Sequence, residues 1–265
     1  MRIAVLGDVA GHADQLRAEL DRLGVRDGRL PDDLVVIQVG DLIHRGPDSE
    51  AVIELVDHHL ERSGRRWVQL IGNHEAQYVH QPVFAWPQKL SRRSAKTLRR
   101  WVARGDARVA AAISTPTREY LVTHAGLTEP FWRRILGGPT TAADAASALN
   151  GLLRGRDASV FAAGVLLNRS SPIVGPLWAQ TATELVPGWL ATRVPFSQIY
   201  GHSTITDWAD PVAPPPTLAG RLVVDHVFKH ERIAVGDQEL VGIDPGHGSH
   251  PVLPWRAFEV TGTVS

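Results

Sequence analysis

The sequence contains no cysteine among its 265 residues. This absence excludes a disulfide scaffold and any zinc or iron–sulfur site built on cysteine ligands. Acidic and basic residues number 28 each, so the chain lacks both the positive excess of a nucleic-acid-binding protein and an acidic tail. No apolar run reaches the roughly 18–20 residues that a membrane span needs, and the N-terminal run is too short for a signal peptide. We therefore expect a cytoplasmic protein with neither a membrane nor a nucleic acid as partner.

Short apolar runs alternate with helical patterns along the first 125 residues, which predicts an α/β protein. We predict strands at 3–6, 34–39, 67–71 and 120–122, and helices at 14–23, 49–61 and 91–104. Strand patterns return at 197–200, 222–227, 233–235 and 240–243. Between them, residues 127–195 hold helical segments at 129–136 and 142–153, which we interpret as an insertion that covers one face of the sheet. No linker or repeat interrupts the chain, so we expect a single domain over residues 1–265.

Five of the predicted strands end in a glycine beside a polar side chain. The five ends are Gly7-Asp8, Gly40-Asp41, Gly72-Asn73, His124-Ala125-Gly126 and Gly201-His202. A single aspartate in such a place is more often a helix N-cap, and a single histidine more often an ordinary surface or core residue. Ligands of open α/β sheets bind outside the carboxyl ends of the strands. Five such ends in series therefore favour one shared site over five unrelated structural roles.

Carboxylate, amide and imidazole groups together are suitable ligands for manganese, iron or zinc. One aspartate can bridge two such ions. Two ions roughly 3.5–4 Å apart can hold a hydroxide between them and stabilise both oxygens of an in-line phosphoryl displacement. The residue types therefore suit a centre of two divalent ions. We expect manganese as the cofactor, with iron and zinc as alternatives.

The order of these motifs resembles the calcineurin-like metallophosphoesterases. Within them it is most similar to the branch that contains protein serine/threonine phosphatases and bacterial diadenosine tetraphosphatases. The resemblance rests on Gly7-Asp8, Gly40-Asp41-Leu42-Ile43-His44-Arg45-Gly46, Gly72-Asn73-His74-Glu75, Thr123-His124-Ala125-Gly126, Gly201-His202-Ser203 and the closing Gly242-Ile243-Asp244-Pro245-Gly246. It implies a four-layer sandwich in which helices flank two mixed β-sheets.

The resemblance also implies which residues bind the two metal ions. Asp8 binds the first ion and Asp41 bridges the two. Asn73, His124 and His202 complete the ligand set of the second ion.

Two more residues are implied to act on the substrate. His74 protonates the leaving oxygen as a general acid. Arg45 clamps the phosphate, because its planar fork matches two phosphate oxygens. The chain is therefore expected to be a metal-dependent hydrolase of phosphate esters or anhydrides. Its substrate is left open between a small phosphomonoester, a nucleotide such as a dinucleoside polyphosphate, and a phosphoprotein.

Two positions depart from the family pattern. The family has a histidine ligand of the first ion two residues after the first aspartate, where this chain has Ala10. It has an aspartate that orients the catalytic histidine three residues after the bridging aspartate, where this chain has His44. Our first hypothesis, which we favour from the sequence, is that His44 binds the first ion together with Asp8, Asp41 and water, as a tyrosine does at the matching position of purple acid phosphatases. The other is that His44 is a partner of His74. His12 is a third candidate ligand, but we expect it to face away in the first helical turn.

Gln180 marks a further departure. It follows Pro176-Leu177-Trp178-Ala179, which resembles a family segment that supplies a second phosphate-binding arginine. Arg154, Arg169 and Arg193 are candidate replacements, although each is more typical of an ordinary surface residue. Trp86 and Trp178 are candidates to stack on a nucleotide base. His247 and His250 flank a glycine-rich turn without motif context, and we assign them no role.

The competing hypothesis is a binding module that keeps the phosphoesterase fold but has lost its first metal through Ala10. A scaffold has no need of metal ligands or of a general acid. The presence of Asp8, Asp41 and His74 therefore favours the enzyme.

Overall fold

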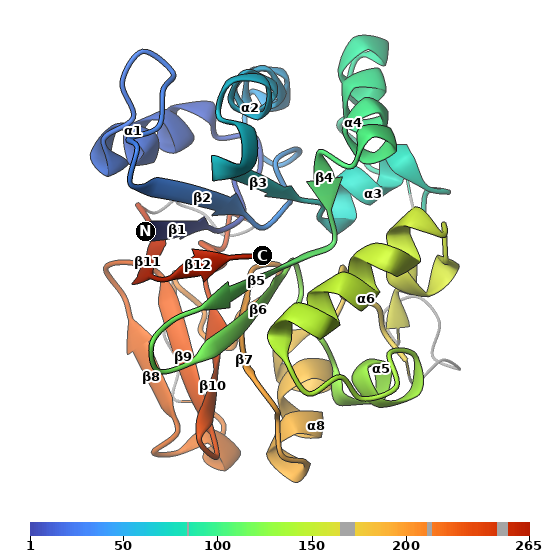
Figure 1. Cartoon of the computed structure of the whole chain (residues 1–265), viewed down its shortest axis with the longest axis vertical. Helices are drawn as coiled ribbons and strands as arrows, with labels where there is room; N and C mark the ends of the chain where they lie inside the picture. The colour runs from blue at the N-terminus through green and yellow to red at the C-terminus, as the bar shows by residue number, and fades with distance from the viewer. Residues whose placement is uncertain (84, 165–172, 211–213, 248–253) are drawn as a thin grey trace.

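Two mixed β-sheets lie face to face at the centre of the computed structural model, which describes all residues except 84, 165–172, 211–213 and 248–253 (Figure 1). The first sheet has the strand order β11-β1-β2-β3-β4. Its strands are β1 (Arg2–Leu6), β2 (Leu34–Gln38), β3 (Trp67–Leu70), β4 (Ala107–Arg108) and β11 (Phe258–Thr261). β1 to β4 are parallel, and β11 runs antiparallel to β1. The carboxyl ends of β1, β2 and β3 therefore share one edge.

The second sheet has the order β12-β5-β6-β7-β10-β9-β8. Its strands are β5 (Ala110–Ser114), β6 (Glu119–Thr123), β7 (Ser197–Tyr200), β8 (Leu222–Asp225), β9 (His230–Val235), β10 (Gln238–Gly242) and β12 (Thr263–Val264). Only β6, β7 and β10 form a parallel group, while the other pairs are antiparallel. These three strands place their carboxyl ends beside one another.

Alternation along the strands builds a core on both faces of the first sheet. In β1, Ile3 and Val5 contact the core between the two sheets, whereas Ala4 and Leu6 contact the core under the helices. All four side chains are fully buried. A strand buried on both faces reads as a continuous apolar run, which is why the sequence identifies β1 and β2 so clearly.

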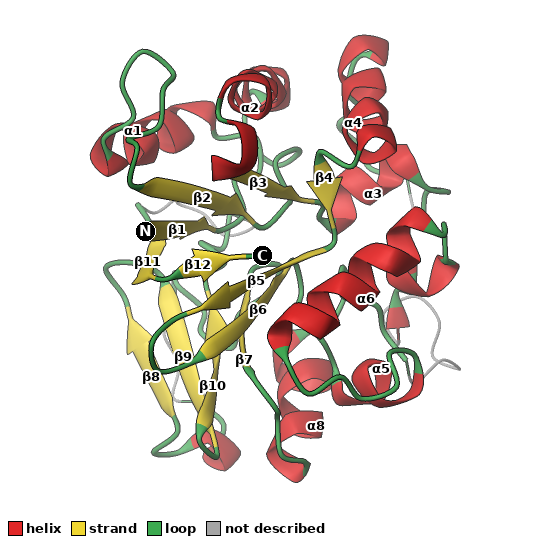
Figure 2. Cartoon of the chain, viewed as in Figure 1, coloured by secondary structure: helices red, strands yellow, loops and turns green. Residues whose placement is uncertain are grey.

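Helices cover the outer faces of both sheets (Figure 2). The N-terminal half supplies α1 (Ala13–Leu23), α2 (Ser49–Arg62), α3 (Asn73–Val79) and α4 (Arg92–Arg104). Residues 127–195 supply α5 (Glu129–Arg134), α6 (Ala142–Arg154), the π-helical turn η3 (Thr181–Leu185) and α8 (Val186–Ala191). α2 contacts β3 in the first sheet, and α6 contacts β5 and β6 in the second. The predicted arrangement of two mixed sheets between helices is confirmed.

Several elements differ from the prediction. The strand expected at 222–227 ends at Asp225, because a turn follows it. β5 was not predicted, since its sequence Ala-Ala-Ala-Ile-Ser lacks the β-branched residues that mark a strand. β11 and β12 were also missed. Among the described residues, no helix is long and apolar enough to cross a membrane.

Candidate metal centre

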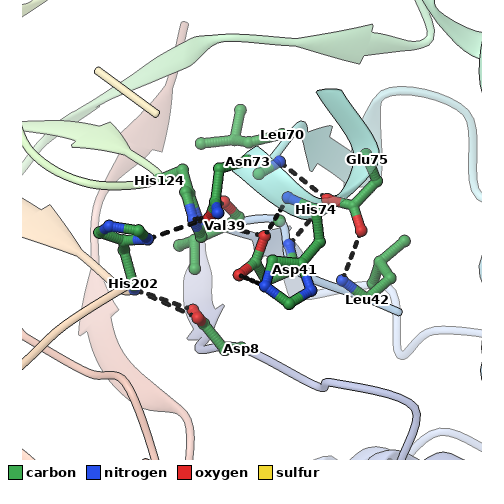
Figure 3. Close-up of polar contacts among 12 residues, drawn as sticks. Asp8, Val39, Asp41, Leu42, Leu70, Asn73, His74, Glu75, His124 and His202 are labelled. Atoms are coloured by element: carbon green, nitrogen blue, oxygen red, sulfur yellow. Dashed lines mark hydrogen bonds and ion pairs between the residues drawn. The ribbon is translucent and has the colours of Figure 1, made fainter. Parts of the chain in front are cut away.

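The loops that follow β1, β2, β3, β6 and β7 meet at one edge of the two sheets, as the sequence predicts. They carry Asp8, Asp41, Asn73, His124 and His202, all of which appear in Figure 3. The site needs close backbone approach. A Cβ atom at position 201 would collide with the Asp8 carboxylate, so only glycine fits there.

Asp41, His124 and His202 form the tightest group at this edge. One possible ligand atom from each lies within 4.8 Å of the others, and no other group of three such residues is found in the described part of the chain. Asn73 Oδ1 lies 3.0 Å from His124 Nε2 and 3.0 Å from His202 Nδ1. Carboxylate, amide oxygen and imidazole donors facing a common point fit a divalent metal ion.

The protonation state of His124 suits a metal ligand. Its Nδ1 lies 3.1 Å from the Val39 carbonyl oxygen, which can only accept, so Nδ1 carries the proton. The Nε2 lone pair is left facing Asp41 Oδ1 at 3.4 Å. Burial lowers the pKa of His124 and, together with repulsion from His124, lowers that of His202 to about 3. Both rings are therefore neutral at pH 7, as metal ligation requires.

The amide of Asn73 has two useful orientations. With Oδ1 inward it faces the two imidazole nitrogens. Rotated by 180°, its nitrogen would donate to His124 and His202 at 3.0 Å each and also reach Asp41. Without a cation the rotated amide makes more hydrogen bonds. A bound cation favours the oxygen, because only the oxygen can coordinate it.

Gln180 lies against His202 and not against a substrate position. Its Nε2 is 3.0 Å from His202 Nε2, and the adjoining Thr181 is bonded to Ser203. If the Gln180 amide turned its oxygen to His202 Nε2–H, Nδ1 of that ring would be free for a metal ion. Among the arginines considered as replacements, exposed Arg193 pairs with Asp237, and Arg169 lies outside the described residues.

Asp41 is positioned by Glu75, whose role the sequence did not reveal. The Glu75 carboxylate accepts hydrogen bonds of 2.8 Å from the backbone N–H groups of Gly72, Asp41 and Leu42. Burial raises the pKa of Glu75 to about 8, and repulsion from Asp41 adds to this effect. Asp41 itself adopts a left-handed backbone with φ of 52°. Such strain costs about 1–3 kcal/mol and is characteristic of functional sites.

His44 contacts His74 and Tyr78 through its two ring nitrogens. Its Nδ1 lies 3.1 Å from His74 Nδ1, and its Nε2 lies 3.0 Å from the Tyr78 hydroxyl. Burial, followed by repulsion from His74, lowers the pKa of His44 to about 4. This geometry favours the second hypothesis, in which His44 is a partner of His74.

Asp8 contacts the backbone of His202 and has its own acidic neighbour. Its two carboxylate oxygens accept from the His202 backbone N–H at 3.1 and 3.2 Å. Burial raises its pKa, and repulsion from Asp244 and then Asp41 raises it further. Asp244 follows β10, the sixth strand to end at this edge, and it was not predicted as a site residue. Ala10 is buried with φ of 47° and offers no ligand atom.

Arg45 and Trp86 border the site. Arg45 is exposed, and its guanidinium carbon lies 6.0 Å from the centre of the Trp86 ring. The ring of half-buried Trp86 lies 4.4 Å from that of His74, measured between centroids. Trp178, by contrast, is only 1% exposed and cannot stack on a substrate.

Two solved structures share this fold. A cold-active protein-tyrosine phosphatase of a psychrophilic Shewanella species aligns with 93% of this chain and 71% of its own, with a TM-score of 0.53 and 15% identity. A protein serine/threonine phosphatase from Saccharomyces cerevisiae, with similarity to human phosphatase PP5, aligns with 93% of this chain and 68% of its own, with a TM-score of 0.52 and 16% identity. At these identities the likeness establishes the fold.

Sequence similarity extends the comparison. The bis(5′-nucleosyl)-tetraphosphatase PrpE (asymmetrical) of Halalkalibacterium halodurans is 38% identical over 78 residues. The match spans 28% of this chain and 31% of the relative, which is less than a third of that protein's length. Residues 1–164, well over half of the chain, match the calcineurin-like phosphoesterases as a family. The chain therefore belongs to the calcineurin-like phosphoesterases, a family of metal-dependent phosphoester hydrolases.

Proposed function

We propose that this protein hydrolyses a phosphate ester or anhydride with two divalent metal ions, manganese being favoured. The second ion would be held by Asp41, Asn73, His124 and His202, and the first by Asp8 and the shared Asp41. The observation that supports this most strongly is the convergence of neutral imidazoles and a carboxylate within 4.8 Å. When bound, the ions would lower the pKa of a water and stabilise charge on the phosphoryl oxygens.

His74 would supply the proton to the leaving oxygen. Its Nδ1 lies 3.2 Å from the Ile43 carbonyl oxygen, which fixes a proton on Nδ1. Its Nε2 lies 3.7 Å from Asp41 Oδ2, and a proton taken up there would form the imidazolium that donates to the leaving oxygen. Burial lowers the pKa of His74, while the charge of Asp41 opposes that shift.

Arg45 and Trp86 support a nucleotide as substrate. Arg45 would hold the phosphate, since its charge reaches the buried carboxylates of Asp8 and Asp244. Trp86 lies directly beside His74 and offers an aromatic face for a base. The relative at 38% identity is a bis(5′-nucleosyl)-tetraphosphatase. We therefore propose nucleoside polyphosphates as the substrate class, ahead of phosphoproteins and small phosphomonoesters.

The test is hydrolysis of diadenosine tetraphosphate, a phosphoserine peptide and p-nitrophenyl phosphate, each with and without Mn²⁺. Wild type, His74→Ala and the control His58→Ala, on α2 away from the site, are compared. We expect Mn²⁺-dependent turnover that is fastest on the dinucleotide and is lost only in His74→Ala. Absence of turnover and of bound metal would overturn the proposal in favour of a binding module.

We also propose that residues 1–265 form one domain that acts in the cytoplasm, with residues 127–195 as a helical insertion. β11 pairs with β1, and β12 pairs with β5, so the last strands of the chain complete both sheets. The insertion lies between β6 and β7 in the chain and reaches the site through Gln180. Limited proteolysis within the insertion is expected to leave the two-sheet core intact.

A further inference from the structure

The first metal ion lacks an imidazole ligand in the residues considered so far. Ala10 stands where the family has that histidine and carries no donor atom. His44 cannot easily replace it, because both of its ring nitrogens already contact other side chains, at 3.1 Å and 3.0 Å. Asp8 and Asp41 alone would leave the ion with only two protein ligands. A site of this kind needs further donors from the same edge of the sheets.

The loop after β10 runs directly beside Asp8. The Ile243 backbone N–H donates to the Tyr200 carbonyl oxygen at 2.8 Å, which extends the pairing of β10 with β7. A Cβ atom at Gly7 would collide with the Ile243 carbonyl oxygen, so the two backbones touch one residue before Asp8. Residues 244–247 therefore follow a strand that ends between the neighbouring β7 and the backbone of Gly7.

Asp244 is a buried carboxylate held in place within this loop. It is 7% exposed, and its Oδ1 accepts a hydrogen bond of 2.8 Å from Gly246 N–H. Its backbone oxygen accepts from Trp208 Nε1 at 2.9 Å. Two buried carboxylates, Asp8 and Asp244, thus face the same region, an arrangement that a divalent cation stabilises.

His247 is the buried imidazole that completes this set. It is 6% exposed, and within the described part of the chain neither of its ring nitrogens makes a hydrogen bond. Its ring stacks on His12, with centroids 4.5 Å apart. The backbone of Asp8 lies close enough to raise the pKa of His247, although its geometry is not that of a hydrogen bond. A buried polar group without a partner is uncommon and calls for an explanation.

We infer that Asp244 and His247 are ligands of the first metal ion, joining Asp8 and Asp41, and that His247 supplies the imidazole absent at position 10. One nitrogen of His247 would bind the ion, and the other would donate to the Asp8 carbonyl oxygen. The donors of this set do not form a group within 4.8 Å, unlike those around Asp41, His124 and His202.

His59, on α2, is a second buried histidine with no hydrogen-bond partner, and we interpret its role as structural. It is 1% exposed, and neither of its ring nitrogens has a partner. Its ring stacks on Trp67 at 4.6 Å, and no carboxylate contributes to its pKa. His247 differs because the backbone of Asp8, a predicted ligand of the first ion, lies beside its ring.

This inference rests on the proposed two-metal function, and metal counting separates the two. Mn²⁺ is titrated into wild type, His247→Ala, Asp244→Asn and His12→Ala, with bound manganese measured after gel filtration and by electron paramagnetic resonance. His12→Ala removes the other ring of the same stack and tests the competing candidate ligand. Circular dichroism verifies that each variant is folded.

We expect two manganese ions per chain in wild type and His12→Ala. We expect one ion, without the spectral signature of a coupled pair, in His247→Ala and Asp244→Asn. Two coupled ions in His247→Ala, or loss of one ion in His12→Ala alone, would overturn the inference while leaving the proposed function intact. No manganese in wild type would instead overturn the proposed function.

Discussion

The two proposed metal-binding regions differ in how far the fold assembles them before metal binds. Around the second ion, Asp41, His124 and His202 already converge within 4.8 Å. Each of these residues lies within three residues of the end of a buried strand, so the sheet register constrains its backbone. Around the first ion, Asp8, the shared Asp41 and Asp244 have that support. His247 lies five residues after β10, and the residues that follow it are outside the described part of the chain.

The difference teaches that strand ends preorganise ligands better than loops do. A donor held by the strand before it loses little conformational entropy when it binds an ion, whereas a donor further along a loop, such as His247, loses more. We therefore expect the second site to bind manganese more tightly than the first. The predictions that follow test this asymmetry, from the largest expected effect to the smallest.

Asp41→Asn should have the largest effect, since Asp41 is the residue that both ions share. The neutral amide removes the charge that faces His74 and His124 at 3.7 and 3.4 Å. We expect loss of both manganese ions and a hydrolysis rate equal to that of metal-free protein. Retention of one tightly bound ion would show that the two sites are independent and would contradict the shared ligand.

His74→Ala should abolish most activity without affecting either metal. Loss of a general acid typically costs about 10²–10⁴-fold in rate. The loss should be greatest for substrates with poor leaving groups, because these depend most on protonation. The measurement is kcat for a series of aryl phosphates, with manganese content determined in parallel. A uniform loss across the series would argue against proton donation by His74.

His44→Ala tests the two hypotheses for that residue. As a positioning residue for His74, it should lower kcat by roughly tenfold to a hundredfold and leave two manganese ions bound. His44→Asp, which introduces the residue that the family has there, should restore most of the rate. Loss of one ion in His44→Ala would instead make His44 a ligand of the first ion.

Gln180→Leu should weaken only the tight site. Gln180 contacts His202 at 3.0 Å, and removal of a group that orients a metal-binding histidine typically lowers affinity by about 10–100-fold. Manganese titration should show the tighter of the two binding steps weakened and the weaker step unchanged. If the weaker step changed instead, our assignment of the two affinities would be reversed.

His59→Leu should change stability and leave the metals unaffected. Burial, followed by repulsion from His58, lowers the pKa of His59 from 6.5 to about 4. The unfolded chain therefore takes up this proton below pH 6.5 while the folded chain does not. Wild type should lose about 1–3 kcal/mol of unfolding free energy between pH 6.5 and pH 4 through this residue. Urea unfolding at both pH values should show a smaller loss in His59→Leu.

The sequence predicted the edge of the sheets that carries the site, because one rule covers all five strand ends. Asp8, Asp41, Asn73, His124 and His202 are brought together as expected. Gly242-Ile243-Asp244 also ends a strand with a glycine close to a polar side chain, so the same rule would have identified Asp244 as a sixth site residue. His247 follows three residues later, with no motif around it, and only the approach of its loop to Gly7 associates it with Asp8.

Contacts between distant segments explain most of what the sequence left open. Glu75 bonds the backbone of Asp41 across 34 residues, and Gln180 meets His202 across 22. Hydrophobic periodicity in the sequence reveals neither of these two contacts. The partner of His44 was one of two hypotheses, because a position in a motif does not show which way a ring points. Tertiary geometry decides these cases.

The central claim is that two unequal metal sites share Asp41, and anomalous diffraction from crystals soaked in Mn²⁺ tests it most directly. We predict two peaks. The stronger should lie among Asp41, Asn73, His124 and His202, and the weaker between Asp8 and Asp41, with a ring nitrogen of His247 at coordination distance. A single peak, or a second ion bound by His44 while His247 remains stacked on His12, would contradict this account.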